Sequence, residues 1–405
     1  MKLWKKVLVG LVLGVILGVI LKEKVVYLKP FGDIFIRLIK MIIVPLIFFA
    51  IVSGITSVKD SKALSRVGIK ASVTYLLTTL FAITIGLGIG TIFEPGSGVI
   101  LNFSGDGISK IPDTNVAKII DTLLNIIPEN AIEAMAQGTI LQVVFFALFT
   151  GITLNTMENT ASKRLSDIFS ILSLMVFRMV HLIIQLSPVA ACALTAWIVG
   201  TQGMVVLEKL LKLVGCAYLA FGVQYLVFGL IIYVWTRLSP VPFFKKSLEY
   251  QTLAFSTSST KAALPTTIKV CQTRLGVSNI SSSFVLPLGA SINMDGIAIY
   301  ISLCALFFAQ ATGKVLEPSD YGCIILTGTL GSIGGAGIPG GTIVMLPMVL
   351  ASVGLPIEGI ALIAGIDRII DMMRTTISIT GDATVALCVD HSEGLLDREK
   401  YYADV

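Results

Sequence analysis

The sequence contains little charge. Of its 405 residues, 14% are charged and 55% are hydrophobic, whereas soluble globular domains carry about 25% charged residues. The formal net charge is only +5, and no basic patch interleaved with aromatic residues occurs, so nucleic acid is not an expected partner. Several apolar runs are long enough to cross a bilayer. The composition therefore predicts an all-α integral membrane protein with the lipid bilayer as its surroundings.

Patterned cysteines and catalytic histidines are missing as well. The six cysteines stand singly and form no C-x-x-C pair, which excludes a zinc site or a disulfide framework of the usual spacing. Ser258 and Lys261 match the S-x-x-K pattern, but its companions S-D-N and K-T-G are absent. His181 and His391 are the only histidines, so a Ser–His mechanism lacks parts. "GLGIG" at 86–90 lies in an apolar run with no phosphate-binding unit after it. We expect neither an enzyme nor a cofactor.

Long apolar segments are abundant instead. Lysine and arginine follow the second, fourth and sixth of them, which predicts a multi-pass protein of the plasma (bacterial inner) membrane with both termini cytoplasmic. Lys22, Lys24 and Lys29 in the first external loop conflict with this rule. The charged N-terminal segment lacks a small-residue cleavage site and is expected to remain as the first helix. The stretch 94–137 is expected to be an external loop or a partly re-entrant connector. The segments lie near 4–21, 34–57, 69–93, 138–156, 168–200 and 204–236.

The last third of the chain repeats one arrangement at nearly equal spacing. "STSSTKAALPTT" (256–267) precedes "NMDG" (293–296), and "GSIGGAGIPGG" (331–341) precedes "DMMRTT" (371–376). Non-helical backbone in hydrocarbon survives only against protein or a water-filled cavity. Small-residue tips inside apolar segments therefore indicate two re-entrant hairpins that meet near the midplane, although ordinary loops between spanning helices are the alternative. Half-helix N-termini at such a place attract anions, and unwound carbonyls bind cations.

A polar stripe follows the second hairpin. If residues 367–382 are helical, Asp367, Asp371, Arg374, Ser378 and Asp382 share one face. Together with Asp295 of "NMDG", four carboxylates then surround one intramembrane arginine, because Arg368 either pairs with the adjacent Asp367 or snorkels to the surface. A salt bridge to Arg374 cannot neutralise all four. Hard oxygen ligands suit alkali cations, so bound cations would supply the missing positive charge.

These motifs resemble those of the glutamate and dicarboxylate/cation symporter family. The serine-rich hairpin ending in "LP", "NMDG", "GxxGxPGG" and "DxxxDMxRT…TGD" occur in the family's order, from Gln251 to Val389. The resemblance implies eight transmembrane helices plus two re-entrant helical hairpins, built as inverted repeats. It also implies a homotrimer in which a transport domain moves like an elevator against a fixed scaffold.

The resemblance also implies roles for residues at matching positions. Arg374 would bind the side-chain carboxylate of an acidic amino acid such as glutamate or aspartate, and Asp371 would bind its amino group. Ser378 and the tip of hairpin one would hold the α-carboxylate. Ile338 and Thr342 of hairpin two would close over the substrate. The full implied substrate set is Ser258, Ser259, Thr260, Met294, Ile297, Ile338, Thr342, Asp371, Arg374, Thr375 and Ser378.

Sodium ions are the implied coupling ions, with protons as the alternative. The first implied sodium site comprises Gly289, Asn293, Ser378 and Asp382. The second comprises Ser291 with the backbone of Ser332, Ile333 and Gly335. The third comprises Tyr75, Thr78 and Thr79 with Asn293 and Asp295.

Three positions depart from the family pattern. Ile297 stands where many members have threonine, Ser378 replaces the asparagine of "NVTGD", and Lys261 occupies a place that is commonly small or acidic. These departures leave a proton-coupled glutamate or C4-dicarboxylate symporter as an alternative to a sodium-coupled acidic amino acid symporter. An ion channel is the alternative of another class, since re-entrant carbonyl tips also build selectivity filters.

The implied domain organisation follows the family order. Residues 1–70 are expected to form scaffold helices 1 and 2, 71–93 helix 3 of the transport domain, and 94–203 scaffold helices 4 and 5 with an external loop. Helix 6 is expected at 204–239, the transport core at 240–390 with hairpin 1, helix 7, hairpin 2 and helix 8, and a cytoplasmic tail at 391–405.

Overall fold

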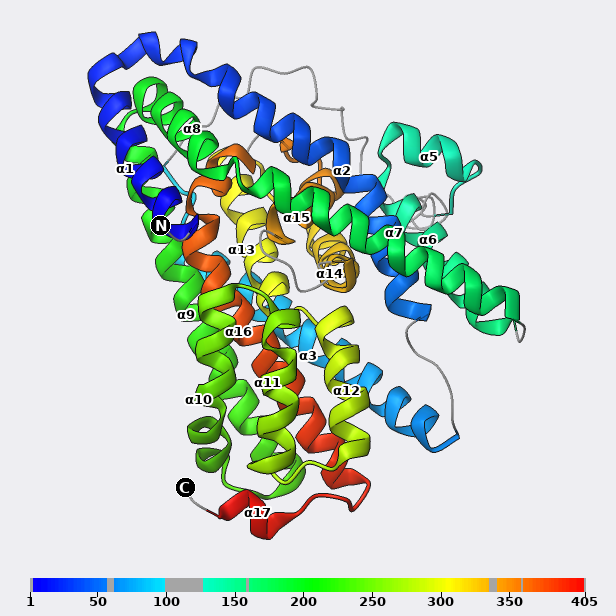
Figure 1. Ribbon diagram of the computed structural model, residues 1–405. Coiled ribbons are helices and arrows are strands. Elements are labelled where there is room, and N and C mark those ends of the chain that lie inside the picture. The colour runs from blue at the N-terminus through cyan, green and yellow to red at the C-terminus, as the bar shows by residue number, and fades with distance from the viewer. Residues whose placement is uncertain are drawn as a thin grey trace.

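The computed structural model describes residues 3–56, 62–98, 127–157, 160–334, 341–357 and 360–403. These residues form helices without a strand (Figure 1), as the composition predicts. Most of the expected external loop and the expected tip of hairpin two lie outside the described residues. The helices are α1 (Leu3–Leu21), η1 (Lys22–Tyr27), α2 (Lys29–Thr56), α3 (Lys62–Phe93), α5 (Ala131–Gln137), α6 (Ile140–Thr156), α7 (Thr160–Ile184), α8 (Ser187–Gln202), α9 (Met204–Thr236), α10 (Pro240–Thr257), α11 (Thr260–Thr273), α12 (Asn279–Ile292), α13 (Asp295–Ala311), α14 (Pro318–Gly334), α15 (Gly341–Ser352), α16 (Ile360–Ser392) and α17 (Arg398–Tyr402).

Three of the described segments are long and apolar enough to cross a membrane. They are Arg66–Phe93 in α3, Val206–Thr236 in α9, and Asn279–Ala311 across α12 and α13. The third is 94% buried inside the protein, whereas the first two are 44% and 39% buried. The α12–α13 segment is therefore enclosed by other helices, and α3 and α9 turn much of their surface outward.

Glycine spacing explains how α1 packs on α8. Gly10, Gly14 and Gly18 recur every four residues and so lie on one face of α1. A Cβ atom at any of them would overlap backbone atoms of α8, at Pro188, Cys192 or Ala196. Small residues at this spacing let two membrane helices approach closely. The contact brings the N-terminal helix against the middle of the chain.

The helices form two groups. In the first, α1 packs on α8, and α2 packs on α6, α7 and α8. In the second, α16 contacts α9, α10, α11, α12 and α13, while α3 packs along α13. Figure 1 shows α5, α6 and α7 to one side of the second group. The second group surrounds α16, which carries the polar stripe, and α8 and α1 of the first group also contact α16.

The apolar segment predicted at 168–200 is not one helix. α7 ends at Ile184 and α8 begins at Ser187, with turn bonds from Gln185 N to Leu182 O and from Leu186 N to Ile183 O. Pro188 lies in the first turn of α8, where a missing N–H costs nothing, because the first N–H groups of a helix have no partner within it. The Ser-Pro pair starts a new helix there.

The C-terminal residues pack on the base of α10 and α11. The buried Nζ of Lys246 in α10 donates to the carbonyls of Arg274, Lys400 and Tyr401, at 2.8 to 3.1 Å. Tyr401 Oη donates to Ser239 O at 2.8 Å. These contacts connect α17 to the residue before α10 (Ser239) and, through Lys246, to the residue after α11 (Arg274).

Candidate functional site

The polar stripe on α16 is present and buried. Asp367, Asp371, Arg374, Ser378 and Asp382 lie on one unbroken helix and are each at most 3% exposed. A side-chain spacing of three or four residues places them on a common face, as the sequence predicts. Burying charges is expensive unless they are paired, so their partners determine what the stripe can do.

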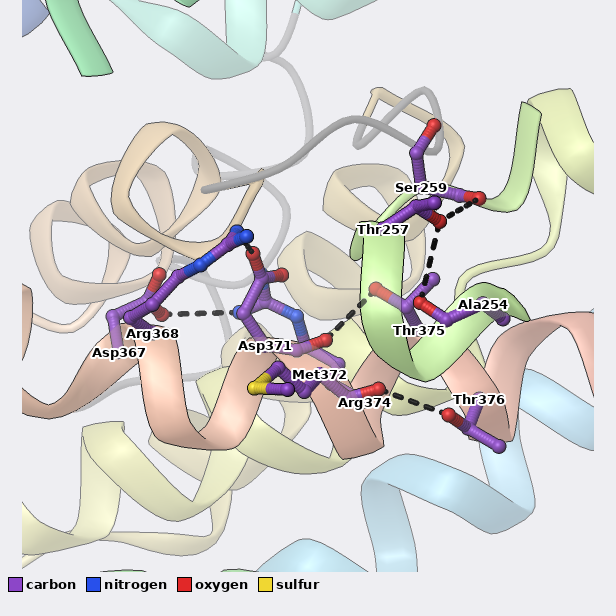
Figure 2. Close-up of polar contacts among 10 residues, drawn as sticks. All are labelled: Ala254, Thr257, Ser259, Asp367, Arg368, Asp371, Met372, Arg374, Thr375 and Thr376. Carbon is purple, nitrogen blue, oxygen red and sulfur yellow. Dashed lines mark hydrogen bonds and ion pairs between the residues drawn. The ribbon is translucent and has the colours of Figure 1, made fainter. Parts of the chain in front are cut away.

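Arg374 joins two of the carboxylates (Figure 2). Its Nη1 lies 3.1 Å from Oδ1 of Asp367, and its Nη2 pairs with Oδ1 of Asp371. Arg368 pairs with Oδ2 of Asp371 at 3.1 Å; of the two alternatives expected for Arg368, pairing with Asp367 or snorkelling, the first is not seen within the described residues. Neighbouring residues on a helix point in different directions, whereas residues three apart face each other. Two arginines and two carboxylates therefore form a closed, neutral ionic cluster.

A tight turn between α10 and α11 faces this cluster. Ser258 adopts the left-handed conformation (φ 52°), and Ser259 caps α11 by accepting a hydrogen bond from Ala262 N at 3.3 Å. Both helices pack on α16, and Figure 2 shows the turn residue Ser259 above Thr375. Ser258 and Thr260 are fully buried, and the Ser258 hydroxyl has no hydrogen-bond partner within the described residues. The N-terminus of α11, with its hydroxyl and N–H groups, thus lies against α16 near Thr375.

The break between α12 and α13 lies on the other side of Arg374. Asn293 ends α12 with an extended backbone, and α13 begins at Asp295. Gly296 N donates to the Ser378 hydroxyl at 3.2 Å. A Cβ on Gly296 would overlap the backbone of Arg374, so only glycine allows this approach. Met294 is buried at the break, and Ile297 is buried on the first turn of α13.

Oxygen atoms from three helices gather around Asn293. Its Oδ1 lies 3.4 Å from the hydroxyls of both Thr78 and Thr79 of α3, and its Nδ2 donates to Asp382 Oδ1 at 3.0 Å. Thr79 also donates to Asp295 Oδ1 at 3.2 Å. The residues of the third implied sodium site thus meet in space, although about 200 residues of sequence separate α3 from the others.

Two carboxylate oxygens in this cluster are unsatisfied. Asp295 Oδ2 and Asp382 Oδ2 are fully buried and have no hydrogen-bond partner among the described residues. Within this part of the chain, neither aspartate has an arginine or lysine within ion-pair distance. An unpaired buried carboxylate oxygen is costly. Hydroxyl, amide and carboxylate oxygens are the donors that hard cations prefer, so these residues could hold a hard cation.

Gly289 brings the first implied sodium site close to α3. A Cβ at this position would overlap both Tyr75 Oη and Asp382 Oδ1. Tyr75 Oη donates to Val285 O at 2.9 Å, and Gly289 O accepts from Asn293 N at 2.8 Å. Carbonyl, hydroxyl and carboxylate oxygens therefore converge beside the bare α-carbon of Gly289.

The remaining predicted residues are only partly placed. Ser291 donates to Pro287 O at 3.0 Å within its own helix, and Ser332 is buried near the end of α14, which contacts α12. Thr342 is fully buried with an unpartnered hydroxyl in the described structure. Ile333 lies in α14, but its side chain, like all of Gly335 and Ile338, falls outside the described residues.

Sequence reasoning did not single out Gln224. This side chain is fully buried in α9, and both of its amide atoms are without a hydrogen-bond partner in the described residues. α9 packs along α16, where Phe228 lies next to Gly381. The sequence held a signal, because a polar side chain within a long apolar helix is expensive to bury in a membrane and calls for a partner.

A neutral ionic cluster and an unsatisfied oxygen cluster, enclosed by apolar helices, are typical of a membrane transporter. The chain belongs to the sodium:dicarboxylate symporter family, whose family model matches residues 3–392. This is a family of transporters and not of enzymes.

Curated relatives agree with the family assignment. The chain is 36% identical to the proton/glutamate-aspartate symporter of Escherichia coli (strain K12), over 93% of this chain and 87% of the relative. It is 36% identical to a C4-dicarboxylate transport protein of Rhodospirillum rubrum (92% and 84% covered). It is 33% identical to the proton/sodium-glutamate symport protein of Bacillus subtilis (strain 168) (92% and 88% covered).

Proposed function

We propose that this protein is a secondary active symporter that takes up glutamate or aspartate together with sodium ions. The carrying observation is the buried pairing of Asp371 with Arg374 on α16, beside the α10–α11 turn. An acidic amino acid carries two carboxylates and one ammonium. Arg374 matches the side-chain carboxylate, Asp371 matches the ammonium, and the turn with Ser378 and Thr375 matches the α-carboxylate.

Substrate binding on this proposal is an exchange of partners. Arg374 is held by Asp367 and Asp371, and Asp371 is also held by Arg368. A substrate carboxylate on Arg374 would release Asp371 toward the ammonium, while Arg368 remains as its second partner. Each of the four charged side chains keeps an ionic partner in the exchange, which keeps their cost of desolvation low, and the α-carboxylate of the substrate is met by hydroxyl and N–H groups.

The charges of the core support coupling to cations. Asp367, Asp371, Arg368 and Arg374 cancel, and Asp295 and Asp382 remain without a cationic partner in the described structure. An acidic amino acid adds one more negative charge. The occupied core therefore needs bound cations, and the oxygen sets around Asn293, Gly289 and Ser291 are the proposed sodium sites. Protons on Asp295 and Asp382 are the alternative source of positive charge. The hydroxyl, amide and carbonyl oxygens gathered beside these carboxylates can coordinate sodium but do not bind a proton at ordinary pH, which favours sodium.

The two helix groups support an elevator mechanism. The first group, with α1, α2 and α5 to α8, corresponds to the proposed scaffold, and the group around α16 corresponds to the proposed transport domain. The α10–α11 pair and the α14–α15 pair are the proposed re-entrant hairpins within eight transmembrane helices. The family resemblance extends this proposal to a homotrimer in the bacterial inner membrane with cytoplasmic termini.

An uptake panel in proteoliposomes tests the proposal. Radiolabelled glutamate, aspartate, succinate and serine are offered while sodium and pH gradients are varied separately. We expect glutamate or aspartate uptake that requires a sodium gradient and little uptake of serine. Equal uptake driven by a proton gradient in sodium-free buffer would show proton coupling, and preference for succinate would show a C4-dicarboxylate carrier. Uncoupled downhill ion flux without substrate would identify a channel.

A further inference from the structure

An apolar groove lies on the outside of the second helix group. It has a volume of about 340 Å³ and runs between α3 and α9. These are the two described membrane-length segments that turn much of their surface outward. Its apolar lining consists of Leu77, Phe81, Leu230, Ile231, Val234 and Trp235.

Two threonines complete the lining without making it polar. The Thr74 hydroxyl donates to Lys70 O at 2.7 Å, and the Thr78 hydroxyl donates to Tyr75 O at 3.0 Å. Both hydroxyls are thus engaged by their own helix, and the remaining wall is hydrocarbon. A ligand of this groove must be apolar along its length.

The groove has the size of part of a lipid tail. Phe81 and Leu230, on opposite walls, are 57% and 60% exposed, so the groove opens toward the bilayer. Its volume is many times what a single water molecule needs, so the groove has room for a segment of an acyl chain.

Positive charge lies at one end of the groove. Lys70 lies one turn before Thr74 on the same face of α3, and Arg66 lies one turn before Lys70. Arg237 directly follows α9, two residues beyond Trp235, and is exposed. Glu393 pairs with both Arg66 and Lys70, whereas Arg237 forms no ion pair within the described residues. Tryptophan together with lysine and arginine marks the level of lipid headgroups.

We propose that the α3–α9 groove is a binding site for an anionic phospholipid, with one acyl chain in the groove and the phosphate at Arg237 and Lys70. The site borders the oxygen cluster, because Thr78 forms part of the groove wall and its hydroxyl lies 3.4 Å from Asn293 Oδ1. An acyl chain packed against Thr78 would hold α3 in the position that the oxygen cluster requires. This inference stands independently of the transported substrate.

Fluorescence quenching by brominated lipid tests the site directly, because Trp235 lines the groove. The chain has three tryptophans, so Trp4→Phe and Trp197→Phe leave Trp235 as the sole reporter. The variant is reconstituted in phosphatidylcholine vesicles with a minority of brominated phosphatidylglycerol or, separately, brominated phosphatidylcholine. We expect brominated phosphatidylglycerol to quench Trp235 at a mole fraction about five-fold lower than brominated phosphatidylcholine requires. This is the preference for anionic lipid that one basic residue near the surface gives. Arg237→Gln should remove much of this preference.

A matched reporter elsewhere on α9 controls for general lipid contact. Leu219 is 45% exposed, does not line the groove, and has no lysine or arginine within six residues on α9. In the same background, Trp235→Phe with Leu219→Trp should be quenched equally by the two brominated lipids. Equal preference at both reporters, or no effect of Arg237→Gln, would overturn the proposal. If the reporter variants do not fold, native mass spectrometry of the unmodified protein and of Arg237→Gln replaces them. Equal retention of phosphatidylglycerol would then overturn it.

Discussion

Replacing Arg374 by cysteine should abolish recognition of acidic substrates. The guanidinium is 2% exposed, lies 3.1 Å from Asp367 and also pairs with Asp371. Arg374→Cys leaves Asp367 without a cation, whereas Asp371 keeps Arg368 at 3.1 Å. A cysteine has no group that could bind a carboxylate in its place. The core then repels a second carboxylate instead of attracting it.

The size of the effect follows from the burial of the pair. Removing one partner of a buried, hydrogen-bonded charge pair costs about 2–5 kcal/mol of binding free energy. At about 1.4 kcal/mol for each factor of ten, the dissociation constant for glutamate or aspartate should rise by roughly 30-fold to several thousand-fold. The folded state should also lose stability. The loss should be smaller than the roughly 3–5 kcal/mol that follows when a buried charge loses its only partner, because Arg368 continues to compensate Asp371.

Uptake into proteoliposomes and calorimetry in detergent measure this loss. We expect negligible glutamate and aspartate uptake by Arg374→Cys, together with new or increased uptake of neutral amino acids such as serine. Arg274→Cys is the matched control, because Arg274 is exposed at the α11–α12 turn and its one ion pair within the described residues is with Glu249, at 3.2 Å. It should transport like the unmodified protein.

The reasoning would be refuted by a variant that still binds glutamate. A loss smaller than about three-fold in Arg374→Cys, far below the range for buried pairs, would mean that Arg374 does not contact the substrate. Arg374→Lys separates charge from shape. It keeps the charge but not the two-pronged geometry of a guanidinium, so it should bind acidic substrates more weakly than the unmodified protein and better than Arg374→Cys.

Three further predictions concern other parts of the core. Gly289→Ala should abolish sodium-dependent stabilisation in a thermal-shift assay, because its Cβ would overlap Tyr75 Oη and Asp382 Oδ1; unchanged sodium dependence would exclude a cation site there. Ile297→Thr with Ser378→Asn should tighten acidic-substrate binding in calorimetry by supplying polar groups at two buried positions, one next to Gly296 and one that accepts its N–H; an unchanged dissociation constant would show that both departures are neutral. Hydrogen bonds from Lys70 and Arg66 lower the pKa of Glu393 from its ordinary 4.5. The stability that these bonds add to the folded state is therefore present above pH 4.5 and is lost as the pH falls through the lowered pKa. The difference in melting temperature between the protein and Glu393→Gln should therefore be seen at neutral pH and vanish in acid, and a difference that persists in acid would contradict this origin.

The α16 stripe was predictable because helix geometry alone determines it. Asp367, Asp371, Arg374, Ser378 and Asp382 share a face on any regular helix. The same rule would have assigned Arg368 to Asp371 rather than to its neighbour Asp367. The break before Pro188 also had a local signal, because proline is favoured in the first turn of a helix. Short-range rules thus account for most of what the sequence indicates about α16 and α8.

The meeting of α3 with the break between α12 and α13 could not be derived from spacing. Thr79 and Asp295 are 216 residues apart in sequence, and their contact depends on how α3 packs along α13. Only the family resemblance placed them together. The unsatisfied oxygens of Asp295 and Asp382 were equally beyond the sequence, because satisfaction of a buried atom depends on every neighbour in space.

The break between α12 and α13 explains why the proposed cations and substrate would bind together. Asn293 contributes to the oxygen cluster through Thr78, Thr79 and Asp382. Three residues later, Gly296 donates to Ser378 and lies against the backbone of Arg374. A cation that orders Asn293 therefore orders the backbone beside Arg374. Linkage is reciprocal, so on the proposed function an acidic substrate must raise sodium affinity by the same factor by which sodium raises the affinity for the substrate.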